Sequence, residues 1–315
     1  MNVVVLGEPL VEFSTAASLD RANVFRLSFS GDALNASVAA AATGASAALV
    51  TRVGADEFGE RLIRFAAGHG VDTRWMVTGE GSTGAYALGA DPSGNRAFAY
   101  MRAGSAASRM GPADVDRSPV SQAAVVLLSG VTAALSESCD QAVRHAAAIA
   151  HGKVVYDPNF RSRLTGPEAA RGVLEAVAPH AALIVPSCPG DSGPLFGTDD
   201  PEEVLRACLA MGARAAAVTM GAEGVLLGTE EHTGDGAGDG SILHIPAIPV
   251  ESVVDQTGAG DAFAGALAGW LSRGADLVQA VRAGTAAAAI SLRGQGGTGR
   301  VATTAEIHAL IGEAA

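Results

Sequence analysis

Residues 254–267 read V-D-Q-T-G-A-G-D-A-F-A-G-A-L, in which glycines and aspartates lead into an apolar helix. The first turn of a helix has N–H groups without partners and the positive end of the dipole, so Gly258, Ala259 and Gly260 form a candidate anion site. Asp261 in that turn could simply stabilise the helix dipole. If a phosphoryl group lies on those N–H groups, however, an attacking hydroxyl lies beside it, and Asp261 could take its proton.

Asp255 lies just before this loop. It could hold the loop or help a nearby cation, or it could be a solvated acid at a strand end, and its spacing leaves these alternatives open. The sequence contains no G-x-x-x-x-G-K-[ST], H-E-x-x-H or G-x-S-x-G pattern, and none of the seven histidines has a partner at metal-ligand spacing. These patterns therefore give no indication of a P-loop, a zinc protease site or a serine hydrolase elbow.

Composition narrows the possible partners. The chain has 315 residues, 48% hydrophobic and 17% charged, with a net charge of −12 and no cluster of basic residues. We therefore expect no nucleic-acid partner. The three cysteines have no C-x-x-C spacing, the N-terminus does not resemble a signal peptide, and no apolar run is long enough for a membrane span. The sequence thus favours a cytoplasmic protein with no membrane partner.

Short apolar strands alternate with helical segments along most of the chain, which predicts a mainly parallel sheet with helices on both faces. The expected strands are Val3–Leu6, Ala47–Val53, Val125–Leu128, Val154–Asp157, Leu183–Val185 and Ala215–Thr219. The expected helices are Asn35–Thr43, Asp56–Ala67, Ser136–Ala150, Pro167–Val177, Pro201–Met211, Ala259–Arg273, Asp276–Leu292 and Thr304–Glu313. Residues 228–240, rich in Gly, Asp, Glu and Thr, are expected to form a mobile surface loop.

One region interrupts the alternation. Tyr86–Ala90 and Arg96–Arg102 flank the turn sequence D-P-S-G-N, which predicts a β-hairpin. Together with Val11–Ser14 and Phe25–Phe29 this hairpin could form a small sheet. We therefore expect a single domain over residues 1–315, with a β-sheet lid from segments at about 10–30 and 84–105.

The stretch D-Q-T-G-A-G-D-A-F strongly resembles the C-terminal signature of the ribokinase-like (PfkB) carbohydrate kinases. S-G-D-A-L-N at 30–35, R-V-G-A-D-E-F-G at 52–59, D-P-N-F-R at 157–161 and V-T-M-G-A-E-G at 218–224 fit the same family, in its order. Within it, G-E-P-L-V-E-F, Y-M-R-A-G-S-A-A-S-R and the P-S after residue 185 are most similar to 2-keto-3-deoxygluconate kinases. The resemblance implies a three-layer ribokinase-like α/β fold and ATP-dependent phosphorylation of a sugar acid at its terminal hydroxyl.

The resemblance also implies roles for individual residues. Asp261 would be the base, and Gly258, Ala259 and Gly260 would form the anion hole. The sugar would be bound by Gly31, Asp32, Asn35, Tyr86, Tyr100, Arg102, Arg161 and Asp255. ATP would be bound by Thr219, Gly221, Gly224 and Ser187, with Mg²⁺ and a monovalent cation such as K⁺ as further cofactors. The family often forms dimers through its lid, so a homodimer is expected.

An arginine offers a planar fork that matches a carboxylate, which suits Arg102 and Arg161 to a sugar acid. Each also has a simpler interpretation: an exposed charge on a lid strand for Arg102, and a charge at a helix start for Arg161. Tyr86 and Tyr100 could equally be a packed cross-strand pair. Two of the chain's three tyrosines lie on this one hairpin, however, which favours contact with a ligand.

The sequence departs from the family pattern in two places. Ser30 stands where the family has the first glycine of G-G-D, which requires a negative φ. The family's N-x-x-E, associated with Mg²⁺, is replaced by P-S-C-P-G-D, in which Asp191 is the one candidate ligand. Two alternatives therefore stay open: a kinase of fructose, ribose or a nucleoside, and a non-catalytic sugar-binding or regulatory protein with the same fold.

Overall fold

The computed structural model describes residues 1–90, 96–229 and 242–313. Its strands are β1 Val3–Leu6, β2 Leu10–Ser18, β3 Arg26–Ser30, β4 Ala47–Gly54, β5 Val71–Asp72, β6 Met76–Gly79, β7 Ala85–Ala90, β8 Arg96–Met101, β9 Val125–Ser129, β10 Lys153–Asp157, β11 Ala181–Ile184, β12 Ala215–Thr219, β13 Val225–Thr229 and β14 Leu243–Ile245. Its α-helices are α1 Asp32–Ala42, α2 Glu57–Gly68, α3 Pro112–Arg117, α4 Gly130–Ala133, α5 Glu137–Ile149, α6 Pro167–Val177, α7 Pro201–Ala210, α8 Ala259–Ser272, α9 Leu277–Ser291 and α10 Thr304–Glu313.

The large sheet runs in the order β14-β13-β12-β11-β10-β9-β1-β4-β5, with β6 also paired to β4. Pairing is parallel from β5 to β12 and antiparallel at β12–β13 and β13–β14. Along β1, Val3 and Val5 point into one core and Val4 and Leu6 into the other. Because both faces of the sheet are buried, each strand is apolar throughout rather than alternating.

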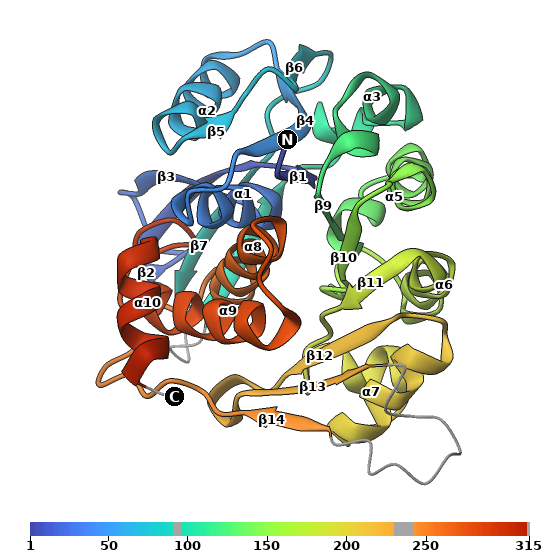
Figure 1. Ribbon diagram of the computed structural model, residues 1–315. Helices are drawn as coiled ribbons and strands as arrows, with labels where there is room; N and C mark the ends of the chain where they lie inside the picture. The colour runs from blue at the N-terminus through green and yellow to red at the C-terminus, as the bar shows by residue number, and fades with distance from the viewer. Residues whose placement is uncertain (91–95, 230–241, 314–315) are drawn as a thin grey trace, which may run out of the picture.

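Figure 1 shows the two helical layers that cover those faces. Helices α1, α8 and α9 lie on one side of the sheet and α3, α5, α6 and α7 on the other. Helix α8 packs against both α1 and α9, and its small residues allow close approach: a Cβ at Gly265 would run into the carbonyl oxygen of Ala36. The predicted three-layer α/β fold is confirmed. No helix in the described part of the chain is both long and apolar enough to cross a membrane.

A second sheet has the order β3-β2-β7-β8. The predicted hairpin is present as β7 and β8, which pair antiparallel with Tyr86 opposite Tyr100. Strand β2 lies between β3 and β7 and is longer at both ends than the predicted Val11–Ser14. The turn 91–95 lies outside the described residues, as does nearly all of the loop expected at 228–240. The small sheet expected beside the main sheet is therefore confirmed for its four strands.

Helix α1 differs from the prediction in a way that matters for the site. It begins at Asp32 rather than Asn35, because Gly31 occupies the N-cap with a φ of 107°. A Cβ at Gly31 would also lie 2.6 Å from the Glu8 carbonyl oxygen, so only glycine fits there. The earlier start places both Asp32 and Asn35 on the helix, within its first turns. The alanine-rich segment predicted a helix here but did not show at which residue the helix begins.

Candidate active site

Helix α8 begins at the loop that carries the D-Q-T-G-A-G-D signature. Gly258 is its N-cap in a left-handed conformation, with φ 78°, and a Cβ there would lie 2.7 Å from Gly297 Cα. At Gly260, by contrast, a Cβ would meet no atom within 4 Å, so open space faces this turn. The Ala259 N–H donates to Gln256 O at 3.3 Å, a long bond within the turn. The N-terminus of α8 is thus open to a ligand, as the sequence predicted for an anion site.

Asp261 lies in the first turn of α8 and is partly buried. Its Oδ2 accepts a hydrogen bond from Asn35 Nδ2 at 2.8 Å, which ties α8 to α1. Burial and the nearby Asp32 charge raise the pKa of Asp261 to about 6, while the Asn35 bond and Arg161 act in the opposite direction. A carboxyl that is ionised above about pH 6 is well matched to general base catalysis near neutral pH.

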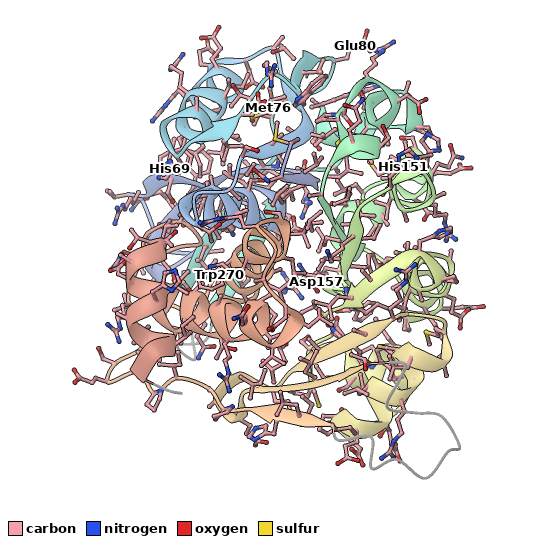
Figure 2. All side chains as sticks on the ribbon, viewed as in Figure 1. His69, Met76, Glu80, His151, Asp157 and Trp270 are labelled. Atoms are coloured by element: carbon pink, nitrogen blue, oxygen red, sulfur yellow. The ribbon has the colours of Figure 1, made fainter. Side chains whose placement is uncertain are left out.

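Three aspartates from different elements converge beneath this turn. Asp32, Asp157 and Asp261 line a cavity of about 20 Å³, together with Asn159 and Ser129. That volume is enough for about one water molecule. Figure 2 labels Asp157 near the middle of the molecule, where the end of β10 meets α8. Burial, followed by the charges of neighbouring aspartates, raises the pKa of Asp157 well above its usual range.

Asp32 presents an unsatisfied acceptor. Its Oδ2 is buried and has no hydrogen-bond partner within the described residues. A buried polar atom without a partner costs about 1–3 kcal/mol, so the arrangement is better satisfied when a donor such as a sugar hydroxyl is bound. This observation favours the predicted role of Asp32 as a ligand contact.

The loop after β10 brings Arg161 towards the aspartates. Asn159 in this loop has a φ of 42°, a conformation that asparagine tolerates better than most residues. The positive charge of Arg161 lowers the pKa of both Asp157 and Asp261, so Arg161 lies close enough to influence both carboxyl groups. Its guanidinium is exposed and donates from Nη1 to Phe160 O at 3.0 Å.

Arg102 at the end of the lid hairpin is paired with a residue whose role the sequence did not reveal. Its Nε donates to Glu8 Oε2 at 2.6 Å, and Nη2 forms an ion pair with the same oxygen. Ser105 Oγ donates to Glu8 Oε1. The Arg102 side chain is only 9% exposed, so the simpler interpretation as an exposed lid charge is wrong. Nη2 faces Glu8 without hydrogen-bond geometry, so none of its N–H groups has an aligned acceptor within the described residues.

Tyr86 and Tyr100 are both substrate candidates and a cross-strand pair. Their ring centroids are 6.1 Å apart. Tyr86 is buried and its hydroxyl donates to Glu12 Oε2, whereas Tyr100 is 42% exposed. Since the Tyr86 proton is held by Glu12, this hydroxyl cannot also donate to a substrate carboxylate. The sequence singled out neither Glu8 nor Glu12, although both lie in the G-E-P-L-V-E-F stretch.

Asp255 is buried, and both its oxygens accept backbone N–H bonds. Oδ1 accepts from Thr257 N at 2.8 Å, and Oδ2 accepts from Gly296 N at 2.9 Å. The carboxylate therefore joins the loop before α8 to the loop after α9. This geometry matches the interpretation of Asp255 as a support for the loop; the interpretation as a solvated strand-end acid is wrong.

The four residues expected at the nucleotide lie together at the ends of β11 and β12. Ser187 pairs with Thr219 in an isolated bridge. At Gly221, with φ 57°, a Cβ would meet no atom within 4 Å, which leaves room for a ligand. Gly224 has a different reason to be glycine, since its φ is 95° and a Cβ would run into the Ile245 carbonyl. Of these four residues, Gly221 is the one whose surroundings are visibly open.

Asp191 joins two loops. Its Oδ1 accepts from Phe160 N at 2.7 Å, and its Oδ2 accepts from both the N–H and the hydroxyl of Ser187 at 2.7 Å. The residue is 1% exposed. With both oxygens saturated, its arrangement suits a structural role better than the expected Mg²⁺ ligation. The described residues contain no group of three or more His, Cys, Asp or Glu side chains that could hold a metal.

Known proteins resemble this chain over nearly its whole length. Residues 2–304 match the pfkB family carbohydrate kinases. The 2-dehydro-3-deoxygluconokinase of Thermoproteus tenax is 34% identical, over 92% of this chain and 88% of its own length. The enzyme of that name from Escherichia coli K12 is 30% identical, covering 86% and 87%. Fructokinase-1 of Oryza sativa subsp. japonica is 31% identical, covering 84% and 81%.

Solved structures give the same result for the fold. A PfkB protein from Polaromonas sp. JS666 has a TM-score of 0.84 at 28% identity, over 98% of this chain and 99% of that one. Aminoimidazole riboside kinase from Salmonella enterica, complexed with its riboside and an ATP analogue, has a TM-score of 0.85 at 22% identity, over 99% and 100%. This chain belongs to the pfkB family and is a carbohydrate kinase.

Proposed function

We propose that the protein transfers the γ-phosphoryl group of ATP to the terminal hydroxyl of 2-keto-3-deoxygluconate. The observation that carries this proposal is the position of Asp261, a partly buried carboxyl with a pKa of about 6 in the first turn of α8. The open turn at Gly258 and Gly260 would hold the phosphoryl oxygens. Asp261 would face the hydroxyl and take its proton, so that anion binding and proton removal take place on adjacent parts of one turn.

Two arginines support a sugar acid as the substrate. Arg102 Nη2 is buried and makes no aligned hydrogen bond even though it is ion-paired with Glu8, and Arg161 adds a positive charge near Asp261, from the loop after β10. A substrate carboxylate would pair with both. Asp32, with its unsatisfied Oδ2, would accept from a sugar hydroxyl. The relatives named 2-dehydro-3-deoxygluconokinase support the same substrate class.

The pairing of Glu8 with Arg102 favours a second candidate substrate, a neutral sugar. Because Glu8 pairs with Arg102, the lid carries no net charge from this pair, and a neutral sugar such as fructose could also be accepted. The similarity to a plant fructokinase supports this alternative. The two candidates share the base and the anion site and differ only in the carboxylate contact.

ATP would lie along the turn at Gly221, near Thr219 and Ser187, where the end of β12 opens. The chain has one lysine, Lys153, so the charge on the phosphates would be balanced by Mg²⁺, by backbone dipoles and by arginine. Mg²⁺ typically keeps several waters and takes one or two carboxylates plus substrate phosphates, so it needs no dedicated cluster of acids. A K⁺ requirement and a homodimer through the lid remain predictions; the edge strand β8 exposes Tyr100 and Met101.

A substrate panel tests the proposal. ADP release is measured with 2-keto-3-deoxygluconate, its C4 epimer 2-keto-3-deoxygalactonate, fructose, ribose and a nucleoside, each with ATP and Mg²⁺. The proposal expects the highest kcat/KM for 2-keto-3-deoxygluconate. A higher value for fructose would support the second candidate, and no preference for either sugar acid would refute the carboxylate contact.

A further inference from the structure

A line of buried polar side chains runs from the small sheet to the base. Ser30 ends strand β3, Asn35 lies on α1, and Asp261 lies in the first turn of α8. Ser30 and Asn35 are 2% and 4% exposed. The line therefore connects the small sheet to the two helices that carry the candidate site.

Asn35 contacts both of its neighbours on this line. Its Nδ2 donates to Asp261 Oδ2 at 2.8 Å and to Ser30 Oγ at 3.3 Å. The Ser30 hydroxyl in turn lies 3.5 Å from Asn35 Oδ1, within reach to donate to it. Ser30 is thus within hydrogen-bond distance of both polar atoms of the Asn35 amide.

These contacts hold the Asn35 amide in place. Its nitrogen faces Asp261, and the Ser30 hydroxyl reaches both its nitrogen and its oxygen. A buried network in which every member is satisfied is rigid, whereas a broken one leaves costly unpaired groups.

We propose that Ser30 is a positioning residue, which ties the end of strand β3 to the Asn35 amide and thereby orients the Asp261 carboxylate towards the substrate hydroxyl. The family pattern has a glycine at this position, so the hydroxyl is a feature of this chain. With Oδ2 held by Asn35, Oδ1 is left to face the substrate. The inference deepens the proposed function and rests on Asp261 acting as the base.

The pH dependence of turnover reports on this arrangement. The charged groups that face Asp261 are Asp32 on α1, Asp157 at the end of β10 and Arg161 after it, and all of these remain unchanged in a Ser30 variant. The Asn35 bond lowers the pKa of Asp261. Loosening that bond raises the pKa, so the base is protonated up to a higher pH and the acid limb of kcat moves upward.

The experiment compares Ser30→Ala and Ser30→Gly with the matched control Ser28→Ala. Ser28 lies on the same strand as Ser30. It donates to Glu12 at 2.9 Å and is not on the line to Asp261. Phosphoryl transfer is followed by ADP release over about pH 5 to 8.5, with the thermal transition of each variant measured at the same pH values. The substrate is the sugar that the wild type phosphorylates best, whether or not it is a sugar acid.

The Ser30 variants should shift the acid limb upward by roughly half a unit to one unit, given the worth of a hydrogen bond to a charged group. Their kcat should fall about two- to sixfold near pH 6 and recover to within about twofold near pH 8. Ser28→Ala should produce no shift. A loss that is equal at every pH, an unshifted acid limb in either folded Ser30 variant, or a matching shift in Ser28→Ala would overturn the proposal.

This outcome is separate from that of the proposed function. If the wild type phosphorylates fructose and not the sugar acid, the proposed substrate is wrong while the Ser30 test proceeds unchanged. If Ser30→Ala does not fold, Ser30→Gly decides the question, and an unshifted acid limb in that variant refutes the proposal.

Discussion

Replacing Asp261 by asparagine removes the base while nearly preserving its shape. The Asn35 amide could still donate to the new side-chain oxygen, so the link between α1 and α8 is retained. With a pKa of about 6, the native carboxyl is about 97% ionised near pH 7.5, and almost all of the base is lost in the variant. General base catalysis typically contributes about 10²- to 10⁴-fold, so kcat should fall by that factor with little change in either KM.

The stability of Asp261→Asn provides a second measurement, in which the variant should equal or exceed the wild type although its activity falls. The folded-state pKa of Asp261 is raised from 3.8 to about 6, so ionisation costs stability, and this cost develops as the pH rises from about 4 to about 6. At neutral pH the cost is at most about 3 kcal/mol, reduced by the partial exposure of the side chain. Asp261→Asn should therefore melt at the same temperature as the wild type or higher, while losing activity.

A steady-state ADP-release assay and a thermal melt of the same preparation measure both effects. The reasoning is refuted if Asp261→Asn keeps kcat within about tenfold of the wild type. It is equally refuted if the loss of activity is matched by a large fall in melting temperature, because the carboxylate would then be a structural group.

Four further predictions follow from the contacts. The wild-type kcat should fall below about pH 6, as Asp261 gains a proton, and a pH profile with no acid limb there would contradict this. Arg102→Ala should lose turnover only on carboxylated sugars. It should also be destabilised by about 3–5 kcal/mol, because Glu8 is left buried and unpaired. Chemical denaturation of Arg102→Ala and of the double variant with Glu8→Gln separates the loss of stability from the loss of substrate contact. Gly258→Ala should lower both kcat and stability, since φ is 78° and the new Cβ would lie 2.7 Å from the backbone of a neighbouring loop; unchanged kinetics would show that the turn tolerates the change. Asp191→Ala should lower the melting temperature without changing the Mg²⁺ dependence of turnover, and a raised Mg²⁺ requirement would restore the metal-ligand interpretation.

The sequence predicted the fold well because its signals were local. Strands buried on both faces appear as short apolar runs, and β1 occupies the predicted residues 3–6. The C-terminal helix α10 also has its predicted bounds. The start of α1 was missed because Gly31, Asp32 and two further residues could belong to a loop or a helix, and a φ of 107° at the N-cap decides between them only in three dimensions.

The candidate site was predicted unevenly. Asp261, Asn35 and Asp32 were named from motifs and do lie together, since helices α1 and α8 pack against each other and their first turns meet. Glu8 and Glu12 were not named, because their importance depends on long-range partners: Arg102 is 94 residues from Glu8 in the chain, and Tyr86 is 74 residues from Glu12. No local pattern reveals that a charge is buried against such a partner.

Asp191 was named from the sequence, but its surroundings favour a different role from the one expected. It was the one acid near the altered N-x-x-E region, so chemistry alone made it a metal candidate. The structure shows that three donors converge on its two oxygens, from Phe160 N and from the N–H and hydroxyl of Ser187. Its role depends on hydrogen bonds between loops, which sequence spacing does not encode.

The most direct test of the account is to identify the phosphorylated product. The enzyme is incubated with ATP, Mg²⁺ and 2-keto-3-deoxygluconate, and the site of phosphorylation is determined by ³¹P–¹H correlation NMR, with Asp261→Asn as the matched control. The account predicts a single phosphomonoester on the terminal carbon with the wild type and almost none with the variant. A phosphate on another carbon, no sugar-acid phosphate at all, or equal product from Asp261→Asn would contradict it.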